Sequence, residues 1–379
     1  MLYNHAMRWI WQHPDWPNFR YEVDALAERE QLFRLGSERL AGRFEALPNA
    51  SREDATIELM LSEALKTSAI EGENLDRASV RSSLLALIAQ DSVPESTDQK
   101  AAGAANLLVD VRQQWDKALS HDMLGNWQCM AVPEQRYKLI TRGEYRSDPS
   151  AMQIVSGPYG RETVHYEAPP AADVPDEMAR FLSWYNVSRP NIKDTPIGGL
   201  ARAGIAHLWF EVIHPFDDGN GRVGRAIADH ALSQSLGYPT TACLATAIAC
   251  DRKSYYTALE RASRGSLDIH AWLDYFADRV IRAQEIAREE VDFVLQKTRF
   301  YEAFGNQLNE RQAKMIARVF AEGRHGFTGG ITTKKYETIA KSPNRTASRD
   351  LADLLAKGII TPLPGSGRNT RYALTVVKP

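Results

Sequence analysis

The chain has 379 residues, too many for one compact core, so we expect two or three domains. Hydrophobic residues make up 44% and charged residues 25%, as in globular proteins, and the absence of any run near the roughly 18 apolar residues of a membrane span excludes a membrane partner. The net charge of -2 is unevenly spread: from Asn306 onward there are 13 Lys and Arg against 5 Asp and Glu, so this tail carries +8 and the remainder -10.

Two features bear on the cellular compartment. The opening residues, MLYNHAMRWIWQHPDW, lack the basic, apolar and small-residue regions of a secretory signal, which predicts a cytoplasmic protein. Cys129, Cys243 and Cys250 are few, odd in number and without CxxC spacing, so we expect neither disulfides nor a thiolate metal site. All three are predicted to be small buried hydrophobic residues.

The first part of the chain is predicted to be helical. Helical spacing runs from Leu26 to Phe44, after which Pro48 and Asn49 break the pattern. Ser51 offers an N-cap for a second helix that runs toward Glu71, and the following glycine suits its C-terminal stop. Further helices are expected at residues 78–90 and 100–118.

One β-hairpin interrupts this helical pattern. The β-rich segments MQIV and TVHY flank a turn sequence of Ser, Gly, Pro and Tyr within residues 153–166. Helical patterns then resume and continue to the tail, at residues 175–187, 196–213, 222–236, 252–263 and 267–297. The fold class is therefore mainly α.

The basic tail has its own pattern. Helices are expected at residues 310–321, 333–341 and 346–357, followed by a turn at Gly358 and a short hairpin in which Leu363 and Tyr372 flank a glycine-rich loop. Three helices followed by such a hairpin are typical of a winged helix-turn-helix domain. Winged helices bind either DNA or proteins, and both remain open here.

The segment from Glu211 to Arg225 carries the chemistry. Pro215 disfavours helical dihedral angles at His214, so a helix should end there and leave the imidazole projecting into a loop, where it can act as a base. Gly219 and Gly221 permit backbone angles that turn successive N–H groups to one side at the start of the next helix, which forms an anion-binding nest.

Charged residues of this segment suit a nucleotide. Arg222 and Arg225 share a face of the second helix and can hold adjacent phosphates, and Asp218 supplies a carboxylate for Mg²⁺. Taken singly, the histidine could be a helix cap, the glycines an ordinary turn and the arginines a solvated face. Their occurrence within twelve residues favours a functional site.

At this point the sequence resembles the Fic family. The family motif is His-[Pro]-Phe-x-[Asp/Glu]-Gly-Asn-Gly-Arg-x-x-Arg, and residues 214–225 match every fixed position. The resemblance implies a Fic-type helical domain and transfer of AMP from ATP to a protein hydroxyl, with His214 as the base and Phe216 pinning the loop. It implies a metal ligand at Asp218 and ATP-binding roles for Asp218, Gly219, Asn220, Gly221, Arg222, Val223, Gly224, Arg225, Tyr255 and Tyr256.

Two further segments are similar to parts of the family. The tyrosine pair at 255 and 256 resembles a segment that borders the nucleotide, although a packing role for one ring is an equal alternative. Relatives often have Asn where this chain has Ser263. The hairpin at Val155, Ser156 and Gly157 corresponds to the family's flap, which pairs with an extended target segment; an ordinary surface hairpin is the alternative.

An inhibitory element is also implied. Residues 67–72, TSAIEG, fit the family pattern [Ser/Thr]-x-x-x-Glu-[Gly/Asn], and the Trp-rich opening resembles the N-terminal module of such Fic proteins. By resemblance, Glu71 forms a salt bridge with Arg225 and occupies the guanidinium that the γ-phosphate needs. The alternative is a solvated glutamate at a helix end.

These observations predict three parts and one principal function. The parts are an N-terminal helical module with the inhibitory helix at 1–97, a Fic catalytic core at 98–297 and a winged helix-turn-helix domain at 306–379. The function is that of an adenylyltransferase acting on a Ser, Thr or Tyr hydroxyl of a target protein or of itself, with ATP and Mg²⁺. The alternatives are removal of AMP, transfer of another phosphate-containing group, or a nucleotide-sensing regulator.

The resemblance also bears on partners. Relatives are often dimeric, so a homodimer is one expectation. Arg345, Arg349, Arg368 and Arg371 are the tail residues expected to contact phosphates if the tail binds DNA.

Overall fold

The computed structural model of the chain describes residues 9–89, 98–134, 140–158, 161, 163–190, 197–323, 327–364 and 370–376. It is mainly helical and has two compact units, one made of Met1–Gly42 with Thr56–Ala287 and the other of Arg43–Ala55 with Arg288–Pro379. Within the described ranges, no helix is both long and apolar enough to cross a bilayer. The predicted mainly α class is confirmed.

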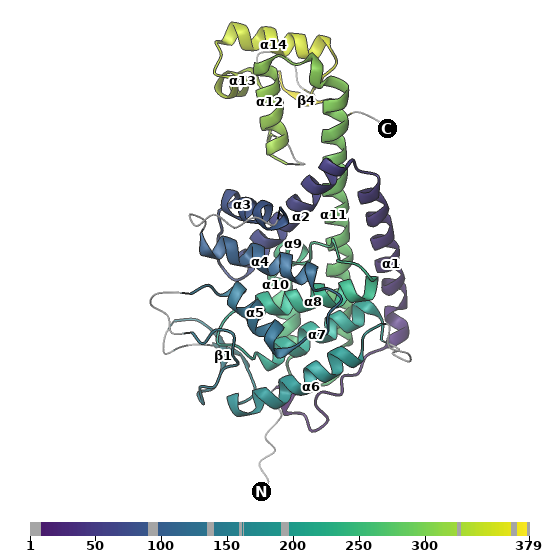
Figure 1. Cartoon of the computed structure of the whole chain (residues 1–379), viewed down its shortest axis with the longest axis vertical. Coiled ribbons are helices and arrows are strands. Elements are labelled where there is room, and N and C mark those ends of the chain that lie inside the picture. The colour runs from purple at the N-terminus through teal and green to yellow at the C-terminus, as the bar shows by residue number, and fades with distance from the viewer. Residues whose placement is uncertain are drawn as a thin grey trace. The chain divides into compact units, whose positions relative to one another are not determined.

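Helices α7 (Gly199–Ile213) and α8 (Asn220–Leu236) form the centre of the first unit and pack along each other (Figure 1). Almost every residue of α7 is buried, as expected for a helix that is covered on all sides. Helices α4 (Gln99–Gln113) and α5 (His121–Ala131) pack on α8, and α6 (Val174–Val187) packs on α7. Both helices that flank the loop at residues 214–219 are therefore held by neighbouring helices.

Three helices precede this centre, namely α1 (Val23–Glu45), α2 (Asn49–Ile70) and α3 (Arg77–Ile88). The predicted N-cap at Ser51 is wrong, because α2 begins two residues earlier. The N–H of Arg52 already donates to the carbonyl of Pro48, at 2.9 Å, so Ser51 lies inside the first turn. Its hydroxyl instead contacts the hydroxyl of Thr298, at 2.7 Å. The predicted stop is confirmed by the positive φ of Gly72, at 83°.

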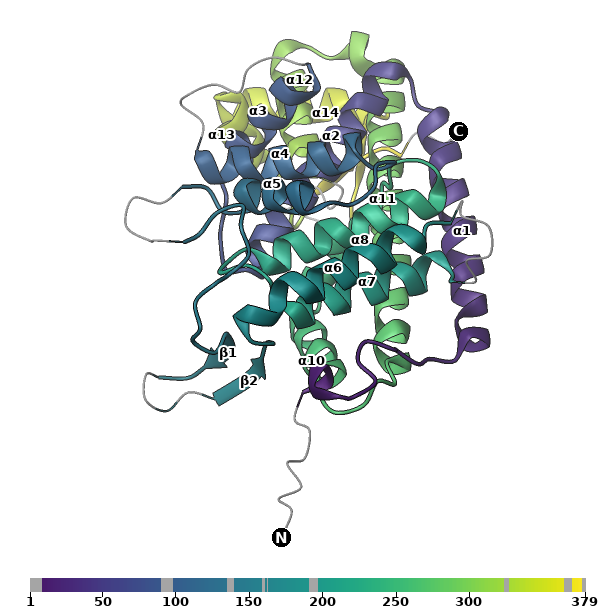
Figure 2. The same cartoon turned by 60° about the horizontal axis from the view of Figure 1, so that its bottom comes forward.

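The predicted hairpin is present as β1 (Gln153–Ser156) and β2 (Thr163–Glu167), an antiparallel pair with a register shift between Ile154 and Val155. Figure 2 shows it standing away from the helices of the first unit. Every residue of β1 is exposed, whereas Tyr166 of β2 is buried. Strand β2 is therefore anchored to the protein, whereas β1 is exposed to solvent. Part of the connecting turn lies outside the described residues.

The remaining helices of this region partly differ from the prediction. Helices α5 and α9 (Leu244–Ala249) were not predicted, because α5 carries Gly125 and four polar residues in eleven and α9 is very short. Helices α10 (Arg252–Ala262) and α11 (His270–Phe304) were expected, although α11 runs farther than residue 297. Short 3₁₀ turns lie at Ile10–Gln12, Ala171–Asp173 and Gly305–Gln307.

The cysteine prediction is wrong for two of the three residues. Only Cys243 is buried; Cys129 is partly exposed and Cys250, beside the N-terminus of α10, is exposed. All three are free thiols.

The second unit contains three further helices, α12 (Glu310–Ala321), α13 (Thr333–Ala340) and α14 (Asn344–Ala356), and an antiparallel pair, β3 (Ile360–Pro362) with β4 (Tyr372–Leu374). Its core is formed by apolar side chains such as Phe300, Met315 and Leu354. These elements follow the predicted order. The tip of the hairpin, with Arg368, lies outside the described residues, and the winged helix assignment stays a prediction, as do the three domain boundaries.

Candidate active site

His214 lies at the C-terminal end of α7 in the left-handed conformation, with φ 50° and ψ 58°. Its N–H still donates to the carbonyl of Phe210, at 2.9 Å, so the helix ends at this residue, as the following proline predicts. A non-glycine residue in this conformation costs about 1–3 kcal/mol and persists only where its surroundings hold it. The residues that hold it therefore belong to the site.

Arg146 supplies most of this support. Its buried guanidinium donates from Nε to the carbonyl of His214, at 2.9 Å, and from Nη2 to the carbonyls of Ile213 and Pro169, at 3.3 and 2.5 Å. Its backbone N–H donates to the carbonyl of Pro215, at 2.8 Å. These contacts satisfy carbonyl groups that the end of a helix leaves without partners. Arg146 was not predicted as a site residue.

The loop between α7 and α8 is pinned from within by Asn220. The amide of Asn220 accepts from the N–H of Phe216, at 2.9 Å, and donates to the carbonyl of the same residue, at 2.7 Å. The ring of Phe216 is fully buried, as predicted. Gln128 of α5 donates to the carbonyl of Asp218, at 3.2 Å, and so ties the loop to a neighbouring helix.

Gly219 is the N-cap residue of α8 and has the left-handed conformation, with φ 88°. A Cβ at this position would lie 2.7 Å from Cγ2 of Val132, so both the backbone angle and the close packing require glycine. A Cβ on Gly221 would lie 2.4 Å from Oε1 of Glu71. The glutamate therefore lies against the backbone at the start of α8, where a helix N-terminus favours an anion.

The guanidinium of Arg225 is held by Thr67 of α2 and by Glu71, the residue that follows this helix. Its Nε donates to the hydroxyl of Thr67, at 2.8 Å, and its Nη2 donates to the carbonyl of Thr67 and to Oε1 of Glu71, at 3.0 and 2.8 Å. The Arg225 side chain is 3% exposed. The ion pair that the resemblance implied between Glu71 and Arg225 is thus present in the structure.

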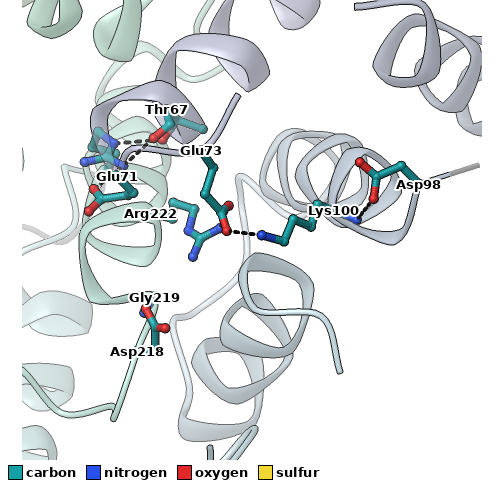
Figure 3. Close-up of polar contacts among 9 residues, drawn as sticks. Thr67, Glu71, Glu73, Asp98, Lys100, Asp218, Gly219 and Arg222 are labelled. Atoms are coloured by element: carbon teal, nitrogen blue, oxygen red, sulfur yellow. Dashed lines mark hydrogen bonds and ion pairs between the residues drawn. The ribbon is translucent and has the colours of Figure 1, made fainter. Parts of the chain in front are cut away.

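Arg222 is held by a second carboxylate of the same segment. Its Nη1 donates to Oε2 of Glu73, at 2.7 Å, and Oε1 of Glu73 accepts from Nζ of Lys100, also at 2.7 Å. Figure 3 shows Glu73 between these two cations, with Asp218 and Gly219 on the other side of Arg222. Both motif arginines are therefore paired with glutamates that follow one another closely in the chain.

The electrostatics of the site favour a neutral imidazole. Burial lowers the pKa of His214 to about 4, and the backbone of Glu211 and the carboxylates of Glu71 and Asp218 oppose this shift only in part. Burial also raises the pKa of Glu211 to about 8, and Glu71 adds to that rise while Arg225 opposes it. The imidazole can accept a proton at neutral pH, and Glu211 is mostly protonated there.

The two tyrosines differ in their surroundings. Tyr255 is buried and its hydroxyl contacts Nε2 of His207, at 2.9 Å, whereas Tyr256 is 40% exposed and donates to the carbonyl of Ile70, at 3.3 Å. Tyr255 therefore packs in the core and Tyr256 borders the end of α2. The hydroxyl of Ser263 donates to the carbonyl of Glu260 within its own helix, at 3.0 Å.

The flap residues lie on the exposed strand β1 and just beyond it. Val155 is 46% exposed, and the hydroxyl of Ser156 contacts Nε2 of His165 across the hairpin, at 2.6 Å. Gly157 has φ 106°, which only glycine adopts readily. The hairpin is held to the main site through Tyr166, whose hydroxyl donates to the carbonyl of Val212 near the end of α7.

Among the residues that the structure describes, no three His, Cys, Asp or Glu side chains lie close enough together to hold a metal ion by themselves. Mg²⁺, however, commonly binds through one or two carboxylates together with substrate phosphates. Asp218 offers one carboxylate directly before the nest, and its Oδ1 accepts from the N–H of Gly219, at 2.7 Å. A single carboxylate at the mouth of a phosphate site suits an ion that arrives with its nucleotide.

Comparison with known proteins agrees with this geometry. Residues 119–232, which include α7, the loop and most of α8, match the sequence model described as "Fic/DOC family". This region of the chain is therefore similar to the Fic/DOC family. A second sequence model, a domain of unknown function (DUF4172), matches residues 9–88 and so covers α2 with Glu71 and Glu73.

Relatives of the Fic domain carry two kinds of names. A "Protein adenylyltransferase Fic" of Culex quinquefasciatus is 25% identical over 280 residues, which are 69% of this chain and 51% of that protein. A "Uridine 5'-monophosphate transferase" of Xanthomonas campestris is 30% identical over 107 residues, which are 27% of this chain and 20% of that protein. The chain thus spans a fifth to about half of the length of these relatives.

The fold of the Fic domain also has a solved counterpart. A Fic family protein from Desulfovibrio desulfuricans G20 superposes with a TM-score of 0.50 at 21% identity, over 92% of this chain and 96% of that one. This likeness supports the fold.

The structure brings most of the predicted Fic residues together and separates a few. His214, Asp218, Gly219, Gly221, Arg222, Arg225 and Glu71 meet around the start of α8. The side chain of Asn220 is used within the loop, Val223 lies in the hydrophobic core, and Gly224 packs against Glu211. The sequence analysis missed four residues of the site, namely Arg146, Gln128, Glu73 and Lys100. Only Glu73 could have been found from the sequence, since it lies two residues after Glu71.

Proposed function

We propose that the chain is a protein adenylyltransferase that transfers AMP from ATP to a Ser, Thr or Tyr hydroxyl. The observation that carries this proposal is the position of His214, a neutral imidazole beside a helix N-terminus whose two arginines are paired with carboxylates. An imidazole next to an anion site is suited to activate a hydroxyl toward a bound phosphate. The relative named a protein adenylyltransferase supports the same reaction.

In this reaction His214 takes the proton of the target hydroxyl while the hydroxyl oxygen attacks the α-phosphorus of ATP. The bond from that phosphorus to the bridging oxygen breaks and pyrophosphate leaves. A positioned base contributes about 10² to 10⁴ in rate. The larger part must come from holding the phosphates in place, which the backbone N–H groups at Gly219–Gly221 and the guanidinium groups of Arg222 and Arg225 are placed to do.

Mg²⁺ would neutralise phosphate charge when it is bound, and Asp218 is the residue that would hold it. Of the other residues predicted to bind ATP, Asn220, Val223 and Gly224 are assigned backbone and packing roles, because their side chains are occupied or absent. Tyr256 is the ring that we assign to the edge of the nucleotide site, since it is exposed and Tyr255 is buried.

Autoinhibition by Glu71 is the second part of the proposal. Its carboxylate lies against the backbone of Gly221 and pairs with Arg225, so it occupies the place that a γ-phosphate would take. The fully exposed strand β1 is the surface that we assign to the target, which would add to its free edge as an extended strand. Self-modification and dimerisation, which the resemblance implied, stay predictions.

The test is mass spectrometry of the full chain carrying Glu71→Gly after incubation with Mg-ATP and lysate proteins. The expected result is an added AMP on Ser, Thr or Tyr of the chain or of a lysate protein, accompanied by release of pyrophosphate. Addition of UMP from UTP instead would favour the chemistry named for the Xanthomonas campestris relative. Loss of AMP from a modified protein without pyrophosphate release from ATP would favour the reverse reaction. Binding of ATP with no transfer at all would favour a nucleotide-sensing regulator.

DNA binding is a separate proposal for the second unit. Asn344, Arg345, Ser348 and Arg349 are exposed along one face of α14, and Arg371 is exposed beside β4. A helix with such a face can enter a groove of DNA while the arginines contact phosphates. Binding of duplex DNA that weakens steeply with added salt, and weakens further in Arg345→Ala, would support this proposal. No retention at low salt would contradict it.

A further inference from the structure

Glu73 bridges two cations that come from different helices. Its Oε2 accepts from Nη1 of Arg222 and its Oε1 accepts from Nζ of Lys100, each at 2.7 Å. The side chains of Arg222, Glu73 and Lys100 are 9%, 22% and 41% exposed. The bridge is thus partly buried, and Arg222 precedes Arg225, which pairs with Glu71, by about one turn of α8.

Local backbone structure fixes each member of this bridge. Helix α2 ends at Ile70, Gly72 turns the chain with φ 83°, and the N–H of Glu73 returns to the carbonyl of Ser68, at 3.0 Å. Lys100 lies in the first turn of α4, where its N–H donates to Oδ1 of the N-cap Asp98, at 3.1 Å. Arg222 lies in the first turn of α8. The backbone of each of the three residues is therefore held by regular hydrogen bonds at a helix terminus or turn.

The two arginines have more donors than the glutamates satisfy. Nε of Arg222 and Nη1 of Arg225 are buried and make no hydrogen bond to any residue that the structure describes. A buried donor without a partner costs about 1–3 kcal/mol. A phosphate group offers three oxygens where a carboxylate offers two, so a chain of phosphates would satisfy these donors better than the two glutamates do.

We propose that Arg222 and Lys100 form an anion subsite. Glu73 fills this subsite in the structure described here, which we call the latched chain. In the open chain, in which Glu73 has withdrawn, a phosphate of a nucleoside triphosphate fills it. This inference rests on the proposed function. It gives Glu73 the role of a second internal competitor. It also adds to the phosphate site a lysine that precedes residues 119–232, so the site is completed from outside the matched Fic domain.

Lys100 has two roles under this proposal, and the experiment separates them. In the latched chain it holds Glu73 in place, and in the open chain it binds phosphate. The measurement therefore uses the full chain with Glu71→Gln and Glu73→Gln, in which no carboxylate remains to be held. Calorimetric titration with α,β-methylene-ATP gives Kd without turnover, and AMP serves as the ligand that lacks the outer phosphates.

Two results are expected. Adding Glu73→Gln to Glu71→Gln tightens binding of α,β-methylene-ATP by about three- to tenfold, because the internal anion is gone. Adding Lys100→Met to the double variant then weakens binding of the same ligand by a similar factor and leaves AMP unchanged, while Lys100→Arg keeps the affinity. The matched control is Lys117→Met in the double variant, since that lysine is 65% exposed and belongs to no anion site.

The overturning results are equally specific. A Kd for α,β-methylene-ATP that responds to Lys100→Met no more than to Lys117→Met would show that Lys100 only ties α4 to the end of α2. An equal loss of AMP binding would place the effect outside the outer phosphates. If no variant binds α,β-methylene-ATP, the proposed function fails together with this inference. A Kd for α,β-methylene-ATP that does not change when Lys100 is replaced overturns the inference alone.

Discussion

Glu71 and Arg225, which lie 154 positions apart in the sequence, form an ion pair with Oε1 and Nη2 2.8 Å apart. The arginine is almost fully buried while the glutamate side chain is 29% exposed, so the pair is partly shielded from solvent and from salt. Removing one partner of such a pair leaves a buried charge uncompensated, which is costly unless another anion replaces it. A nucleotide phosphate is that other anion in our account, so each contact to Arg225 from α2 is expected to oppose nucleotide binding.

Thr67 gives the first prediction, because it holds the same guanidinium through its hydroxyl and its carbonyl. Thr67→Val removes the hydroxyl contact and keeps the shape. A hydrogen bond to a charged group contributes about 1.5 kcal/mol or more, so AMP transfer by the otherwise unmodified chain should rise about tenfold. The rate is measured with ATP labelled at the α-phosphate. Thr67→Ser keeps the hydroxyl and should leave the rate near that of the parent; an equal rise in both variants would contradict the role of the hydroxyl.

Gly219 gives the second prediction. Gly219→Ala meets both a left-handed backbone angle and Cγ2 of Val132 at 2.7 Å, so it should distort the phosphate loop and abolish transfer in the Glu71→Gly background. Gly237→Ala is the matched control, because Gly237 has a similar φ of 79° at the end of α8 but open space around an added Cβ. The control is expected to lose about 1 kcal/mol of unfolding free energy and to keep its activity. Equal activity of the two variants would contradict the account of the loop.

The third prediction concerns pH and Glu211. Burial raises the pKa of this carboxyl to about 8, and the charge of Glu71 adds to the rise. When Glu71 leaves, that contribution is lost and the pKa of Glu211 falls, so the open chain binds fewer protons and a rise in pH favours it. Transfer by the parent chain, divided by transfer by Glu71→Gly, should therefore increase severalfold between about pH 7 and about pH 9. Glu211→Gln should make this ratio independent of pH. If the ratio in that variant still rises with pH as it does in the parent, the effect belongs to another titrating group.

The sequence predicted the backbone geometry of the site because that geometry is local. The motif at residues 214–225 contains its histidine, glycines and arginines within one helix–loop–helix, and Pro215 and Gly219 dictate the backbone there. Glu71 was found for a similar reason, since a short pattern and a glycine stop mark the end of its helix. The structure places both segments as expected.

What the sequence could not predict depends on tertiary contacts. Arg146 lies in an irregular segment, and nothing in its neighbours indicates that it caps α7 and holds the left-handed His214. From the sequence, Lys100 is expected to be an ordinary surface residue at the start of a helix. In the structure it forms an ion pair with a glutamate that lies 27 positions earlier. The N-cap of α2 was placed at Ser51 because serine is a strong cap, whereas the turn actually closes on Pro48.

The central claim is that His214 directs transfer of the α-phosphoryl group of ATP and that Glu71 restrains it. The most direct measurement compares ATP labelled at the α-phosphate with ATP labelled at the γ-phosphate, using the parent chain, Glu71→Gly and Glu71→Gly with His214→Ala. The account predicts strong protein labelling from the α-label alone in Glu71→Gly, weak labelling in the parent and none once His214 is replaced. Labelling from the γ-phosphate, or undiminished α-labelling without His214, would contradict it.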